Sequence, residues 1–104
     1  MFEVFGFYKF KKLISLNKNK LFIQDFLIKK GIRGTVIIAK EGLNGTISGK
    51  TKDIRDAINK IKKIFSIKEF DNSNTSKSKF QPFHKPKVKI KKEVVPMSLT
   101  LNSK

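Results

Sequence analysis

The spacing of hydrophobic residues changes several times along this chain, and each change marks a predicted element. In Val4–Leu13 the side chains alternate as in a strand, with Phe5 and Phe7 on one face and Tyr8 and Phe10 on the other. We expect one aromatic set to pack on helices and the other to be partly covered or exposed on the sheet. An aromatic platform for stacking RNA bases is the alternative.

Two segments show the one-turn repeat of an amphipathic helix. The first runs over 19–30, with Asn17 or Asn19 as its N-cap, and Gly31 is expected to end it. The second runs over 52–65 and is expected to be capped by the hydroxyl of Thr51. The apolar stripes of the two helices are Phe22, Ile23, Phe26 and Leu27 in the first, and Ile54, Ile58, Ile61 and Phe65 or Ile64 in the second.

The stretch between the two helices, RGTVIIAKEGLNGTISG at 33–49, predicts a central β-hairpin. Its first strand, Thr35–Ala39, is apolar at successive positions, as in a strand that is covered on most sides. Because Gly and Asn tolerate positive φ, we expect the turn at Glu41–Gly45 and the return strand at Thr46–Ser48. Local backbone bonding in that turn then explains Asn44.

The chain after the second helix is more polar. Ile67–Phe70 predicts another strand, and the unpatterned Asp71–Ser78 predicts a loop. Lys87–Lys91 alternates strictly, which is typical of a half-buried edge strand with Val88 and Ile90 turned inward.

This order of elements predicts an α+β, ferredoxin-like (βαββαβ) fold with a further edge strand at the C-terminal end. Right-handed crossovers place both helices on one face of an antiparallel sheet and leave the other face open. The chain has 104 residues, which suits one domain. We expect that domain to span 1–96, with 97–104 as a linker or the start of a following domain.

The net charge of +16 predicts a polyanionic partner, and nucleic acid is the usual one. Only Arg33 and Arg55 among the 24 basic residues are arginine, which favours point-charge contacts with phosphates over bidentate reading of bases. An A+T-rich genome would also enrich lysine, isoleucine and asparagine, so a compositional origin of the charge stays open.

The predicted edge strand offers a row of ammonium groups roughly 7 Å apart on one face, which could follow a phosphate backbone. The alternative is that these lysines only prevent aggregation of an exposed edge. The candidate RNA-binding residues are Lys85, Lys87, Lys89, Lys91 and Arg33, and the hairpin adds Glu41 and Asn44 as candidate contacts.

Several kinds of site are excluded by composition. The chain contains no cysteine, which excludes disulfides, thiolate metal sites and cysteine nucleophiles within it and fits a cytoplasmic protein. The single histidine, His84, cannot build a histidine-rich metal site, so neither metal nor cofactor is expected. No apolar run approaches the ~20 residues of a membrane span.

Three stretches resemble a known family: GTVIIAKEGLNGTISG at 34–49, FYKF at 7–10 and PFHKPKVKIKKEVVPM at 82–97. They are similar to the N-terminal acylphosphatase-like domain of the bacterial rhodanese-domain tRNA uridine hydroxylases, which oxidise the wobble uridine of tRNA. The resemblance implies two partners, tRNA and a C-terminal rhodanese-like domain beyond residue 104 that carries the essential cysteine. The present chain is then expected to bind or position tRNA and to be inactive alone.

Two other functions are alternatives to this one. Acylphosphatase activity is disfavoured, because that family holds phosphate with an arginine in a glycine-rich turn after the first strand, and Lys11–Ser15 has neither. The remaining alternative is a non-catalytic interaction module whose open sheet face packs on a partner domain without specific RNA binding.

Overall fold

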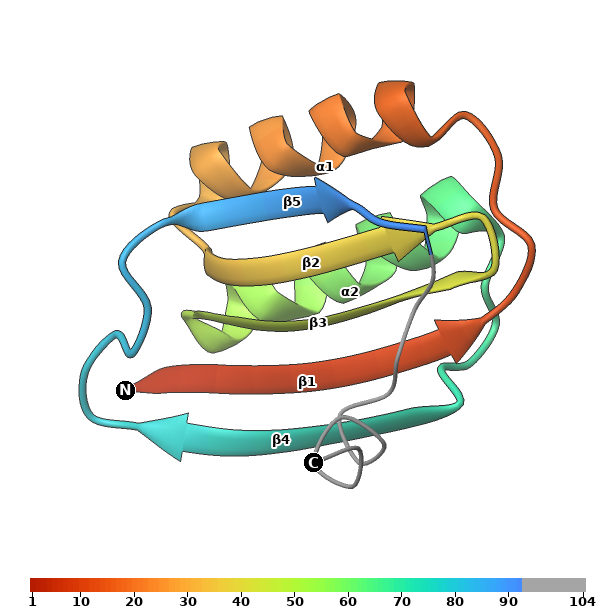
Figure 1. Cartoon of the computed structure of the whole chain (residues 1–104). Coiled ribbons are helices and arrows are strands. Elements are labelled where there is room, and N and C mark those ends of the chain that lie inside the picture. The colour runs from red at the N-terminus through yellow and green to blue at the C-terminus, as the bar shows by residue number, and fades with distance from the viewer. Residues whose placement is uncertain (93–104) are drawn as a thin grey trace, which may run out of the picture.

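The computed structural model describes residues 1–92, and the predicted boundary at residue 96 and the segment 97–104 lie outside them. One five-stranded sheet in the order β4-β1-β3-β2-β5 makes up the described part, together with two helices (Figure 1). The pairs β4–β1, β1–β3 and β3–β2 are antiparallel, and β5 runs parallel to β2. The elements are β1 (Phe2–Phe10), α1 (Leu16–Lys30), β2 (Arg33–Ala39), β3 (Gly42–Gly49), α2 (Thr51–Phe65), β4 (Asn72–Ser78) and β5 (Pro86–Ile90).

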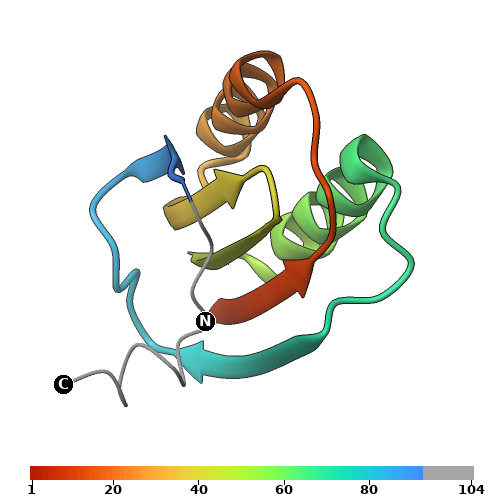
Figure 2. The ribbon, with the colours of Figure 1, turned by 45° about the vertical axis from the view of Figure 1, so that its right-hand side comes forward.

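This arrangement confirms the predicted ferredoxin-like α+β fold. Both helices lie on the same side of the sheet, where they bury a continuous apolar core (Figure 2). The core includes Ile23 and Leu27 of α1, and Ile54, Ala57 and Ile61 of α2. Neither helix is long and apolar enough to cross a membrane.

The aromatic alternation of the first strand is confirmed, with shifted ends. Phe5 and Phe7 are buried beneath the helices, whereas Tyr8 and Phe10 lie on the opposite face. The strand begins at Phe2 and ends at Phe10, because the chain then turns to pair with the β2–β3 connection. Leu13, predicted as its last residue, is buried in the segment that leads to α1.

The hairpin is confirmed, but the predicted turn was wrong. Only Lys40 and Glu41 connect the strands, since Ala39 already pairs with Gly42. Asn44 therefore lies inside β3, opposite Ile37, and local bonding in a turn does not explain it. Gly45 is also a strand residue, where a Cβ would lie 2.7 Å from the Thr35 carbonyl oxygen. Close packing between strands thus explains the glycine of an Asn-Gly pair that looked like a turn.

The strand predicted at Ile67–Phe70 was wrong, as was the loop predicted at Asp71–Ser78. The last antiparallel strand is β4, which starts at Asn72 and pairs with β1 along its whole length. It is an edge strand with exposed side chains on both faces, so no hydrophobic alternation revealed it. Phe70 instead fills the core from the connection, with its ring centroid 4.9 Å from that of Phe7.

The helix ends also differ from the prediction. Helix α1 begins at Leu16 after Ser15, and α2 begins at Thr51 after Lys50, and neither start has a side-chain cap. Gly31 is confirmed as the end of α1, with its N–H bonded to the carbonyls of Ile28 and Leu27. Phe22, predicted in the apolar stripe, is 53% exposed.

Asp71 connects the start of β4 to the end of β1. Its carboxylate accepts hydrogen bonds from the Phe10 backbone N–H at 2.7 Å and from Lys9 Nζ at 3.3 Å. The Phe10 N–H is the main cause that holds the pKa of Asp71 below its ordinary value; burial opposes this shift, and Lys9 adds to it. Because the folded pKa is the lower one, Asp71 stabilises the fold above its unfolded pKa of about 4, and this contribution is lost as the pH falls through the folded value.

We expect Asp71→Asn to lower the free energy of unfolding at pH 7 by about 1 kcal/mol, because the charge-assisted bond is lost at a partly exposed site. Between pH 5 and pH 3 the free energy of unfolding should fall less in the variant than in the wild type, as measured by urea unfolding. Asp25→Asn is the control, because the Asp25–Lys29 pair is exposed and should contribute little. Equal pH dependence of the wild type and the Asp71 variant would contradict this expectation.

Candidate nucleic-acid interface

The face of the sheet turned away from the helices, here called the open face, is built from side chains of all five strands. Strand pairing aligns them in two rows across the sheet, because residues directly opposite each other share a face. No helix covers these positions, so polar side chains can remain in contact with water. The rows are Lys89, Ile37, Asn44, Tyr8 and Asn72, and then Lys87, Thr35, Thr46, Gly6 and Asn74.

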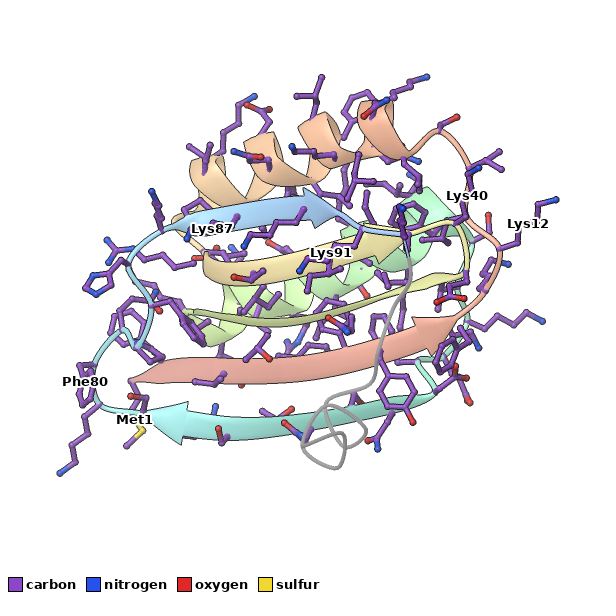
Figure 3. The ribbon with its side chains drawn as sticks, in the orientation of Figure 1. Met1, Lys12, Lys40, Phe80, Lys87 and Lys91 are labelled. Atoms are coloured by element: carbon purple, nitrogen blue, oxygen red, sulfur yellow. The ribbon has the colours of Figure 1, made fainter. Side chains whose placement is uncertain are left out.

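The predicted lysine row occupies the β5 edge of this face. Val88 is buried against the core, so Lys87 and Lys89 lie on the opposite side of the strand and are exposed. Lys85 precedes β5 and Lys91 follows it, and both are exposed as well. Figure 3 shows Lys87 and Lys91 near the two ends of β5. The predicted alternation is confirmed except at its end, where Ile90 is 37% exposed.

The four lysines in and beside β5, here called the β5 lysines, keep their charge available to a ligand. Within residues 1–92 none of the ion pairs involves Lys85, Lys87, Lys89 or Lys91. Within the described residues four other lysines do form ion pairs, namely Lys9, Lys29, Lys30 and Lys77. One edge of the open face is therefore lined by lysine side chains that have no ion-pair partner within residues 1–92.

Arg33 lies next to this row but contacts the protein itself. Its Nη1 donates to the Phe83 carbonyl at 3.5 Å, in the connection between β4 and β5. The same connection is attached to β3, because Gln81 exchanges hydrogen bonds with the hydroxyl and the carbonyl of the buried Ser48. The structure thus gives Arg33 a role in holding this connection, beside its candidate role in RNA binding.

The structure separates the two hairpin candidates. Glu41 lies in the turn at the end of the sheet, where its backbone carbonyl accepts the Lys11 N–H at 2.9 Å. Asn44 lies in the middle of the open face and lines two hollows there. Only Asn44 therefore shares a surface with the lysine row.

Sequence reasoning missed Asn72 and Asn74, because it placed them in a loop. They line the β4 side of the open face, opposite Tyr8 and Gly6. One signal could have located them, since 71–81 contains neither Gly nor Pro and the predicted fold requires a strand after the second helix.

The connection from β1 to α1 shows no phosphate cradle. The N–H groups of Lys11 and Leu13 donate to the carbonyls of Glu41 and Lys40, so they do not point toward a ligand. Lys12 and Lys40 lie at this same end of the sheet in Figure 3. In residues 1–92 no three His, Asp or Glu side chains come together as a metal site.

Comparison with known proteins agrees with this architecture. Residues 2–94 match the family described as the UPF0176 acylphosphatase-like domain. The chain belongs to this family. It is 72% identical to the tRNA uridine(34) hydroxylase of Pelagibacter ubique (strain HTCC1062) over 104 residues, which cover all of this chain and 35% of that protein. It is 40% identical to the enzyme of the same name from Anaplasma phagocytophilum (strain HZ), with coverage of 94% and 35%. The chain thus spans about a third of the length of these relatives.

Solved structures share the fold of this UPF0176-type domain at low sequence identity. The acylphosphatase of Bacillus subtilis superposes with a TM-score of 0.58 at 11% identity, over 88% of this chain and 100% of that chain. Full-length HypF in its phosphate- and nucleotide-bound form superposes with a TM-score of 0.60 at 19% identity, over 92% of this chain and 13% of that chain. These similarities support the fold and carry no activity to this chain.

Proposed function

We propose that this chain is the N-terminal domain of a tRNA uridine hydroxylase, in which it binds and positions tRNA and docks a C-terminal rhodanese-like domain. The observation that carries the proposal is the 72% identity, over the whole chain, to a relative named tRNA uridine(34) hydroxylase. The segment 97–104 would then lead toward the rhodanese-like domain, and the protein would work in the cytoplasm, where its tRNA substrate is found.

The domain itself is proposed to bind rather than to catalyse. Sulfur-transfer or persulfide chemistry needs a thiolate nucleophile, and the chain has no cysteine. The catalytic cysteine would belong to the rhodanese-like domain. The contribution of this domain to the reaction is then to hold the substrate.

The phosphates of tRNA are proposed to contact the β5 lysines. These exposed ammonium groups stand at alternate positions along β5 and the residues that flank it, roughly 7 Å apart within the strand, and have no ion-pair partner within residues 1–92. Lysine is a flexible point charge that suits phosphates and carries little sequence information. The proposed contacts are Lys85, Lys87, Lys89 and Lys91, with Arg33 beside them.

The test is the salt dependence of tRNA binding by the 104-residue chain. If about four phosphates are neutralised, log K should fall against log salt with a slope of about −3, a loss of about 60-fold between 50 and 200 mM. Charge reversal of Lys87, Lys89 and Lys91 to Glu should reduce the slope to about −1 to −2, because only Lys85 and Arg33 would remain. Fluorescence anisotropy of labelled tRNA at several salt concentrations measures both slopes.

The matched control is reversal of three exposed helix lysines, Lys18, Lys52 and Lys63, on the layer behind the sheet. It removes the same net charge and should leave most of the slope intact. If both triple variants lose the same affinity, only overall charge matters, and the interaction module without specific RNA binding becomes the better account of the domain.

A further inference from the structure

The open face contains a hollow of about 270 Å³ centred on β1, away from the lysine row. Gly6 lies beneath it, in the middle of the strand. A Cβ at this position would lie 3.2 Å from Asn74 Oδ1 and 3.7 Å from Thr46 Oγ1, so the side chains of both neighbouring strands converge over the glycine. Glycine inside a strand often marks a place where a ligand or another backbone comes close.

The lining of this hollow combines apolar surface with uncharged polar groups. Three carboxamides and one hydroxyl surround it, from Asn44, Asn72, Asn74 and Thr46, and Tyr8 supplies an aromatic wall. Each carboxamide presents both a donor and an acceptor, as does the edge of a nucleobase. The phenol ring of Tyr8 is half-buried and held edge-on by Phe10, with the ring centroids 5.8 Å apart.

This chemistry suits a base better than a phosphate or a protein side chain. A phosphate would prefer the lysines of β5, which stand three strands away, on the order of 14 Å at the usual strand spacing. An apolar anchor residue of a protein partner would bury the amides of Asn72 and Asn74 without hydrogen bonds, which costs free energy, whereas the edge of a base can bond them. The hollow is also smaller than the roughly 300–1,000 Å³ of sites for drug-sized ligands, which suits a single planar group.

We propose that the hollow over Gly6 receives one unpaired base of an RNA strand, and that phosphates further along the same strand lie on the β5 lysines. The base stacks against Tyr8 while the amides of Asn72 and Asn74 hydrogen-bond its edge. This inference rests on the proposed function, because it assumes that the open face binds tRNA. It adds base contact to a surface whose lysines contact only phosphate.

Tyr8 makes the inference directly testable, because it is the only tyrosine in a chain without tryptophan. The fluorescence of the 104-residue chain therefore reports on the hollow itself. Pentauridylate should quench this fluorescence saturably. An abasic ribose-phosphate pentamer of the same charge should bind the lysines and leave the fluorescence nearly unchanged.

Two substitutions distinguish binding in the hollow from binding elsewhere on the open face. Gly6→Val pushes the Asn74 amide into the hollow while placing a good strand former in the strand, so the fold should survive. It should weaken pentauridylate binding about tenfold, from the loss of one stacked base, and leave the affinity for the abasic pentamer unchanged. Ser76→Val is the control, because it adds the same side chain to an exposed position of β4 opposite Val4, outside the hollow.

The outcomes separate this inference from the function on which it rests. If tRNA binds with a slope near −3 but pentauridylate does not quench Tyr8, or Gly6→Val binds it as the wild type does, the base site is wrong and the phosphate contact stands. Equal quenching by the abasic pentamer also overturns the base site. If the lysine reversals leave tRNA binding unchanged, the phosphate contact fails whatever Tyr8 reports.

Discussion

Replacing Gly34 by alanine should strongly destabilise the domain. Gly34 has a φ of +122°, and a Cβ there would lie 2.2 Å from the Thr46 carbonyl oxygen and 2.8 Å from Ile47 Cα. Both atoms belong to the backbone of β3, so neither can rotate away as a side chain could. The N–H of Gly34 also donates to the Lys85 carbonyl at 3.1 Å, where β5 joins the sheet. A shift of β2 would therefore break pairing on both sides.

The expected cost of Gly34→Ala is more than about 4 kcal/mol, against a total stability of roughly 5–15 kcal/mol for a domain. Gly31→Ala is the matched control. Its φ is also positive, at +69°, but no atom lies within 4 Å of the added Cβ, so the cost should be about 1 kcal/mol. Urea unfolding followed by circular dichroism measures both variants. Similar losses in the two would mean that backbone conformation alone, and not the contact with β3, determines the effect.

Truncation of Leu27 to alanine should lower the free energy of unfolding by about 2–5 kcal/mol, whereas truncation of Phe22 should cost less than about 1 kcal/mol. The side chain of Leu27 is completely buried in the core between α1 and the sheet. Phe22 belongs to the same predicted stripe but is 53% exposed, and its ring lies 6.0 Å from Lys18 Nζ.

This pair of variants tests the structure against the helical pattern. From the pattern alone, Phe22 is a core residue, and a core phenylalanine costs about 3–5 kcal/mol when truncated to alanine. Thermal and urea unfolding of Leu27→Ala and Phe22→Ala distinguish the two expectations. A loss at Phe22 that equals or exceeds the loss at Leu27 would show that α1 is rotated about its axis relative to the arrangement described above.

The spacing of hydrophobic and polar residues was enough to predict the elements that turn one face to the core and the other to water. The stripe of α2 and the alternation of β5 could be predicted because each buries one face and exposes the other. The same alternation located the lysine row, since residues two apart on a strand share a face. The apolar run Thr35–Ala39 likewise predicted the central position of β2, which is paired on both sides.

The hydrophobic pattern did not reveal β4, and tertiary structure alone decided the hollow over Gly6. Strand β4 is held by backbone pairing with β1 and exposes its side chains, so the hydrophobic effect left no periodic trace in its sequence. The hollow joins Asn44, Tyr8 and Asn74 from three strands that are far apart in the chain. Their meeting depends on strand order and register, which are set by long-range pairing and packing rather than by the spacing of residues within any one element.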